Sequence, residues 1–226
     1  MSRGYKATDG SNNRESRRQY LKIAMTRQRI TAQVLADRTG ISKRTIEGYT
    51  SGRYDLADAS GVSVAKISMV LNLKVFALGG ARKVTPEMLA TVSSEPTAVY
   101  VLDVPTPYDV MVEFRWAMKV RQYDVNKLSE KSGVETHVIY EMLENRRNIC
   151  KMAAATVFTL CRTMTYHPYF LYGFRPRNEY RQYFENIQNK RKKNLIRREV
   201  FNMAQNEYHK RLEADGFDID DEDCFL

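Results

Sequence analysis

The sequence predicts an all-α protein in which two tandem copies of one helical domain are followed by a C-terminal helical extension. Two observations lead to this fold class. Residues 31–49 have the pattern of a helix, a tight turn and a second helix. The same pattern recurs 93 residues later without a gap, so that Leu35 falls on Leu128. Each copy spans about sixty residues, which is enough to bury one helical core.

The segment 31–49 carries the residue types that two steeply crossing helices require. Ala36 is small, so the second helix can approach the first, and Gly40 can adopt the positive φ of the turn. Ser42 stands where the N-cap of the second helix belongs. Four apolar side chains are expected to pack inward: Leu35, Ile41, Ile46 and Tyr49. The residues left at the exposed start of the second helix are Ser42, Lys43, Arg44 and Thr45.

The repeat extends on both sides of this segment. Gly40 falls on Gly133, and small Ala36 falls on small Ser129. Further matched pairs are Ala24 and Ala117, Met25 and Met118, Ile41 and Val134, Ile46 and Ile139, Arg53 and Arg146, Val64 and Val157, and Leu78 and Leu171. A repeat of this length indicates two copies of one domain rather than a solenoid, whose units are shorter and more numerous. We therefore expect domains at residues 15–80 and 110–173.

The first copy, from about Arg18 to Gly80, resembles the Cro/C1-type (lambda-repressor-like) helix-turn-helix family. Besides the residues quoted above, the resemblance includes Ser51-Gly52-Arg53, a later helix from Val62 to Leu71, and the closing positions Leu73, Val75, Phe76 and Leu78. It implies a five-helix bundle that binds duplex DNA, often as a dimer and commonly as a transcriptional repressor or activator. Thr50 replaces the family's usual acidic residue, so any contact of that carboxylate is lost. The second copy resembles the family more weakly and is degenerate.

The charge distribution fits a polyanionic partner. The chain has 36 Lys and Arg against 27 Asp and Glu, a net charge of +9, with the excess in residues 1–60 and 174–214. No apolar run approaches the roughly twenty residues that span a bilayer, and no secretory signal opens the chain. The few cysteines fit a reducing cytoplasm. We therefore expect a cytoplasmic protein without membrane contact.

The segments outside the two domains are assigned by composition. Residues 1–14 predict a flexible basic arm, either a disordered tail or an arm in the DNA minor groove. In the connector 81–109, Thr85 and Pro86 predict the start of a short helix. Residues 98–104 favour a strand, whose partner would be the same segment of a second subunit in a homodimer.

The last segments are a basic helical extension, residues 174–214, and an acidic tail, residues 215–226. The extension is either one long helix or two helices hinged at the basic run 190–193. Its apolar stripe indicates packing on the second domain or on a second subunit, a further route to a homodimer. The basic run either contacts phosphates or forms a solvated face. The tail either keeps the protein soluble or folds back on basic surfaces.

Base contacts are expected from the second helix of the first copy. Lys43 and Arg44 can donate to guanine O6 and N7, and Glu47 can accept from cytosine N4. Gly48 has no side chain and would allow close approach. Phosphate contacts are expected at the start of the preceding helix and just after the second helix. The DNA-binding candidates of this copy are Thr31, Gln33, Ser42, Lys43, Arg44, Thr45, Glu47 and Arg53.

The second copy carries other residues at the equivalent positions. Its candidates for DNA contact are Thr136, His137, Tyr140 and Arg146. Three nearby carboxylates would repel phosphates: Glu135, Glu141 and Glu144. Two interpretations stay open, namely DNA contact by this copy, or a degenerate copy kept for protein–protein packing.

No catalytic, metal or cofactor chemistry is recognisable in the sequence. The histidines lie far apart, and no Cys or His pair has zinc-ligand spacing. Cys161 and His167 could be a nucleophile and a base, but a half-buried helical cysteine and a loop histidine are the preferred interpretation. We expect no enzyme, no cofactor and no metal site.

The sequence thus predicts a sequence-specific regulator of transcription, a repressor that binds double-stranded DNA with its first recognition helix in the major groove. The alternative is a protein-interaction module, such as an antitoxin or anti-repressor, that masks a protein partner. A role in DNA architecture or replication control would use the same binding without a promoter.

Overall fold

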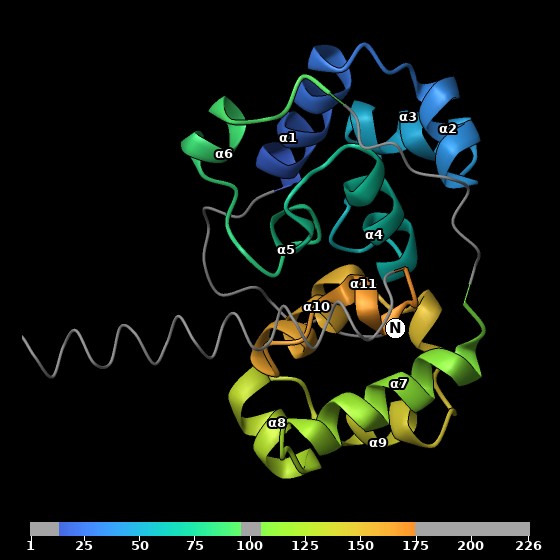
Figure 1. Ribbon diagram of the computed structural model, residues 1–226, viewed down its shortest axis with the longest axis vertical. Helices are drawn as coiled ribbons and strands as arrows, with labels where there is room; N and C mark the ends of the chain where they lie inside the picture. The colour runs from blue at the N-terminus through green and yellow to red at the C-terminus, as the bar shows by residue number, and fades with distance from the viewer. Residues whose placement is uncertain (1–13, 96–104, 175–226) are drawn as a thin grey trace, which may run out of the picture. The chain divides into compact units, whose positions relative to one another are not determined.

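A computed structural model describes residues 14–95 and 105–174 of the chain, all within one compact unit (Figure 1). Every regular element in these ranges is a helix, and the only β pairing there is one isolated bridge, so the all-α class is confirmed. None of these helices combines the length and apolar character that crossing a bilayer requires. The basic arm before Arg14, the strand at residues 98–104, the helical extension beyond Phe174 and the acidic tail lie outside the described residues.

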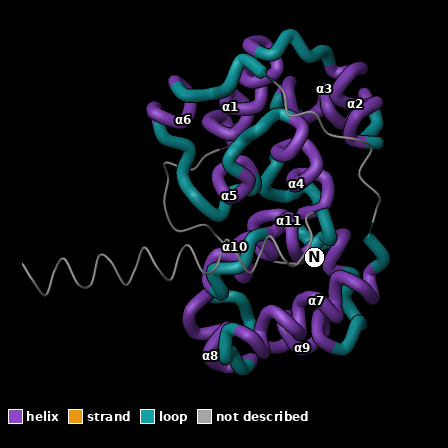
Figure 2. The backbone as a smooth tube through the Cα atoms, viewed as in Figure 1, coloured by secondary structure: helices purple, strands orange, loops and turns teal. Residues whose placement is uncertain are grey.

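The first repeat consists of five helices joined by short loops (Figure 2). They are α1 (Arg14–Arg27), α2 (Ala32–Thr39), α3 (Lys43–Ser51), α4 (Gly61–Val70) and α5 (Val75–Leu78). The connector forms α6 (Pro86–Ala90), which begins at Pro86 with Thr85 as its N-cap, as predicted.

The second repeat has the same order of helices. They are α7 (Pro107–Val120), α8 (Val125–Ser132), α9 (Thr136–Leu143), α10 (Ala154–Thr163) and α11 (Pro168–Leu171), with a 3₁₀ turn, η1 (Ile149–Lys151), before α10. Adding 93 to the bounds of α1, α2, α4 and α5 gives the bounds of α7, α8, α10 and α11. Helix α7 begins before the predicted domain boundary at Val110, because Thr106 caps it and Pro107 occupies its first turn.

The backbone repeats even where the residue types differ. Every described residue with positive φ has a partner with positive φ 93 positions away. The pairs are Arg29 and Gln122, Gly40 and Gly133, Gly52 and Asn145, Asn72 and Thr165, and Gly80 and Gly173. Since a non-glycine residue rarely adopts this conformation, the shared turns identify the two repeats as copies of one chain path.

The crossing of α2 and α3 is held by the side chains that the sequence predicted, with one exception. Leu35 and Ile46 are fully buried, and Tyr49 is buried. Ile41, in the turn before α3, is only partly buried, whereas its counterpart Val134 in the second repeat is buried. The place of Ile41 in the core prediction was therefore wrong.

One ion pair ties α1 to the loop between α3 and α4. Arg17, itself buried, donates from Nε and Nη2 to the two carboxylate oxygens of Asp55 at 2.9 and 2.6 Å. Burial alone would raise the pKa of Asp55, but the hydrogen bonds and charge of Arg17 hold it below its usual 3.8. The Ala57 amide also donates to Asp55 at 3.0 Å, so the loop conformation depends on this carboxylate.

The two repeats pack on each other through α4 and α5 on one side and η1 and α10 on the other. We call this contact the repeat junction. Rings of Phe76 and Phe158 meet edge to face across it, with centroids 6.4 Å apart. The Tyr169 hydroxyl hydrogen-bonds to Ser68 at 3.1 Å. The repeats therefore share an interface and are not independent domains joined by a flexible linker.

Replacing Asp55 with asparagine is expected to destabilise the fold by about 3 kcal/mol, because the buried ion pair with Arg17 loses its negative charge. The folded-state pKa of Asp55 is lowered, so its stabilisation is complete above about pH 4 and is lost as the pH falls through the folded-state pKa. Chemical denaturation at pH 7 and at lower pH measures both effects. Asp58→Asn, at an exposed residue of the same loop, is the control and should change little. Equal losses in the two variants would contradict this account.

Candidate nucleic-acid interface

The turn between α2 and α3 fixes where α3 begins. Gly40 has φ 69° and its amide donates to the Ala36 carbonyl at 2.8 Å. The Ser42 hydroxyl accepts a hydrogen bond from the Thr45 amide at 3.2 Å, so Ser42 is the N-cap that the sequence predicted. Buried Thr39, which sequence reasoning missed, donates to the Leu35 carbonyl and accepts from the Ile41 amide. These bonds hold the start of α3 in one orientation.

The first turn of α3 separates into capping and projecting side chains. The hydroxyls of Ser42 and Thr45 hydrogen-bond to each other at 2.7 Å and are used within the protein. Lys43 and Arg44 are exposed, and Lys43 Nζ lies 3.8 Å from Glu47 Oε1 with both side chains more than half exposed. Such an exposed pair is weak and can exchange for an external partner. Lys43, Arg44 and Glu47 are therefore the side chains available to a ligand.

Gly48 does not provide the close approach to DNA that the sequence predicted. It is buried, and a Cβ atom on it would overlap the ring of Tyr54. The Tyr54 amide donates to the Gly48 carbonyl at 3.0 Å, and the Tyr54 ring packs edge to face on Tyr49. The glycine is needed inside the protein, while partly exposed Tyr54 is an additional surface residue beside α3.

The candidate phosphate contacts lie around the start of α2. Thr31 caps α2 by accepting from the Val34 amide at 3.2 Å, and Gln33 donates to Asp37 at 2.8 Å on the exposed side of the helix. The backbone amides of the first helical turn have no acceptor within the helix and can donate to an anion. Arg53 is exposed just after α3.

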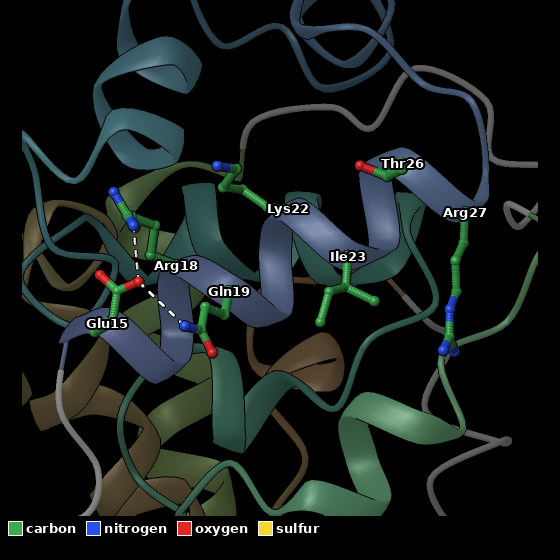
Figure 3. Close-up of a pocket in the computed structure, with 7 residues that line it drawn as sticks. All are labelled: Glu15, Arg18, Gln19, Lys22, Ile23, Thr26 and Arg27. Atoms are coloured by element: carbon green, nitrogen blue, oxygen red, sulfur yellow. Dashed lines mark hydrogen bonds and ion pairs between the residues drawn. The ribbon is translucent and has the colours of Figure 1, made fainter.

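A groove along α1 adds residues that the sequence analysis did not consider. Figure 3 shows its side chains, and Glu15 there accepts hydrogen bonds from Arg18 and Gln19. The lining residues are Glu15, Arg18, Gln19, Lys22, Ile23, Thr26 and Arg27. A second hollow shares Lys22 and Thr26 and continues to Arg29, Thr31 and Thr50.

The basic side chains around this groove differ in their contacts within the protein. Arg27 holds the connector by donating to the carbonyls of Ala90 and Val92 at 2.9 and 3.1 Å. Lys22 and Arg29 are exposed beside the N-cap of α2. The i and i+4 spacing of Arg18 and Lys22 on one helix face was the sequence signal that could have identified this basic strip.

The second repeat presents different chemistry at the equivalent surface. Thr136 and His137 are exposed in the first turn of α9, and Tyr140 is 48% exposed. Glu135 makes no capping hydrogen bond, unlike Ser42, its counterpart in the first repeat. Base-edge contact from α9 would therefore use neutral hydrogen-bonding groups.

The three carboxylates near α9 are each matched by a basic side chain. Glu141 lies 2.6 Å from Arg147, and Glu144 pairs with Arg146. The Glu135 carboxylate lies 3.0 Å from Nδ1 of His137, an ion pair when the imidazole is protonated. These pairs offset the expected repulsion of phosphates. Arg146, the candidate for DNA contact, would have to bind a phosphate while it also pairs with Glu144.

Cys161 and His167, which were considered as a catalytic pair, both have structural roles. Cys161 is fully buried in α10, not half-buried as predicted, and burial raises the pKa of its thiol. His167 caps α11 by accepting from the Tyr169 amide at 3.3 Å. A protonated buried thiol is a poor nucleophile. Within residues 14–95 and 105–174, no group of three His, Cys, Asp or Glu side chains is placed to hold a metal ion.

Comparison with protein-family models, with curated proteins and with solved structures finds no match to this chain. The resemblance to the Cro/C1-type family therefore rests on the residues quoted from the sequence.

The substitution Gly48→Ala is expected to cost about 1 kcal/mol or more, because the new methyl group must displace the Tyr54 ring. In a Tyr54→Ala background the same substitution should instead stabilise by about 1 kcal/mol, since alanine is the better helix former. Thermal unfolding of the four variants of this cycle tests both signs. A stabilising Gly48→Ala in the wild-type background would show that the ring does not depend on the glycine.

Proposed function

We propose that the protein is a sequence-specific double-stranded DNA-binding regulator of transcription in the cytoplasm. It uses two tandem lambda-repressor-like helix-turn-helix domains and acts as a repressor. The observation that carries this proposal is the start of α3, where Lys43 and Arg44 project from a helix whose orientation is fixed by Gly40 and Ser42. A helix presented by its N-terminal residues is the geometry that enters a major groove.

The mechanism assigns different tasks to the surrounding residues. Lys43 and Arg44 contact base edges, while Gln33 and Arg53 position the domain through phosphates. Lys22 and Arg29 extend the cationic surface along α1. With a net charge of +9, the chain is attracted to any duplex, and base contacts then select the site. Occupation of the site controls transcription sterically.

A second candidate function is supported by the surface of the second repeat. Tyr140 on α9 and Tyr108 on α7 are 48% and 62% exposed, and tyrosines are enriched in protein interfaces. A module that masks another protein, such as an antitoxin or anti-repressor, would use such a surface and would not need Lys43 and Arg44.

Replacing Lys43 and Arg44 together with alanine is expected to weaken binding to the preferred duplex by at least about tenfold, since each good base contact contributes about 1–3 kcal/mol. Selection from a random duplex pool gives the preferred sequence. Fluorescence anisotropy then compares it with a scrambled duplex, which the wild-type protein should bind about a thousandfold more weakly.

The control variant Lys74→Ala/Lys119→Ala removes the same charge from exposed positions outside α2 and α3. It should lower the affinity for both duplexes alike, because only non-specific attraction is reduced. Wild-type protein without any sequence preference would refute the proposal. The masking role would be favoured if the Lys43→Ala/Arg44→Ala variant formed a stable complex with a cellular protein and kept the biological activity of the wild-type protein.

A further inference from the structure

The repeat junction has the geometry of an internal two-fold axis. The Gly61 amide donates to the Met152 carbonyl at 3.0 Å, and the Ala154 amide donates to the Ala59 carbonyl at 2.7 Å. Under the 93-residue shift Gly61 corresponds to Ala154, and Ala59 corresponds to Met152. The two hydrogen bonds are thus one bond made in both directions, which is the mark of an isologous contact.

The residues between these bonds pair with their own counterparts. Ser60 and Ala153, which are equivalent under the shift, form an isolated antiparallel bridge. An antiparallel pair of equivalent residues is what a two-fold axis produces when it passes between two chains. The axis therefore lies at this bridge.

Side-chain packing across the junction is reciprocal as well. A Cβ atom on Gly61 would overlap the Tyr172 hydroxyl, and one on Gly79 would lie 3.3 Å from the Ala154 methyl group. Gly61 corresponds to Ala154, and Gly79 corresponds to Tyr172. The contact of Gly61 with Tyr172 and the contact of Gly79 with Ala154 therefore join equivalent positions. At Gly61 the missing side chain leaves the space that the Tyr172 hydroxyl fills, whereas at Gly79 it leaves the space that the ring of Phe158 fills beside Ala154.

A two-fold rotation keeps the position of a point along its axis and inverts directions across it. A two-fold axis that relates the whole repeats places their equivalent helices α3 and α9 at the same height along it, with opposite directions across it. Duplex DNA has two-fold axes of its own, and half-sites related by such an axis are inverted repeats. One duplex lying across this axis can meet α3 and α9 as the two halves of an inverted site when their exposed faces point to the same end of the axis, and the inference below requires this orientation.

The two helices carry no common residue at the positions that face a ligand. The available residues Lys43, Arg44 and Glu47 correspond to Thr136, His137 and Tyr140. Two of the positions assigned to phosphates keep their chemistry, since Arg53 corresponds to Arg146 and the amide side chain of Gln33 to that of Asn126, whereas Thr31 corresponds to the carboxylate Asp124. Phosphate contacts carry no sequence information, whereas base contacts do. Two equivalent repeats thus present different side chains on α3 and α9.

We propose that one chain acts as its own dimer and binds an asymmetric bipartite DNA site. The two half-sites are inverted relative to each other, have different base sequences and are separated by a fixed spacer. The inference rests on the proposed DNA-binding function and specifies its ligand. The surfaces of α4, α5, η1 and α10 that form the repeat junction are already used within one chain. Holding α3 and α9 together therefore does not need a second copy of the chain.

The test uses the full chain and the duplex selected from a random pool. The expected motif has two unlike, inverted halves, and mass photometry should show one chain per duplex. Inserting about five base pairs, half a helical turn, between the halves should lower the affinity at least about tenfold, to that of a duplex with the α9 half scrambled. A flexible pair of domains would tolerate the insertion. Tolerance, a palindromic motif with two chains, or a single half-site would each overturn the inference while leaving specific DNA binding intact.

Two double variants separate the halves. Lys43→Ala/Arg44→Ala should lose discrimination in one half of the motif, and Thr136→Ala/Tyr140→Ala should lose it in the other, without a change in the thermal unfolding midpoint, because these side chains are exposed. If the second variant keeps full discrimination at every base pair, α9 is not a reader and the inference fails. If the wild-type protein has no sequence preference at all, the proposed function itself is wrong.

Discussion

The reciprocal backbone hydrogen bonds at the repeat junction are the interaction on which the rest of the described structure depends. Gly61 and Ala154 are the first residues of α4 and α10, so their amides have no acceptor within their own helices. Both residues are buried, and a buried donor without a partner costs about 1–3 kcal/mol. Each repeat supplies the carbonyl that the other needs, from Met152 and from Ala59. Either repeat alone would expose one of its own helix starts to water, and the donor is buried and bonded only when both repeats are folded.

The Arg17–Asp55 ion pair supports the same junction from a distance. Asp55 accepts from the Ala57 amide, and the Ala57 carbonyl in turn accepts from the Ala155 amide of the second repeat at 3.0 Å. A charge on α1 thereby fixes the loop that meets the neighbouring repeat. The same loop follows α3, so one short segment links the end of α3 to the contact between the repeats. Rigidity at the junction is therefore transmitted to the surface that would meet a ligand.

Local patterns predicted from the sequence what local interactions determine. Gly40 and Ser42 were identified because a left-handed turn and a helix cap each need particular residue types at fixed spacing. The repeat and most of the core positions followed from apolar spacing. The role of Gly48 was predicted wrongly, because the ring that covers it, Tyr54, becomes its neighbour only when the chain turns after α3. The junction was missed for the same reason, since nothing in the neighbourhood of Gly61 indicates a partner almost a hundred residues away.

A rigid junction would change how much binding free energy α3 and α9 must each supply in the proposed complex. Two domains on a flexible linker lose conformational freedom when both bind, and the second domain adds less than its full contact energy. With α4 packed on α10 and the helix starts hydrogen-bonded across the axis, that freedom is already lost on folding. Neutral contacts from Thr136 and Tyr140 would then add to the affinity almost in full, although α9 lacks the cations of α3. In the proposed complex the same rigidity would make binding by α9 dependent on spacing, since α9 could not move to follow a half-site that lies on another face of the duplex.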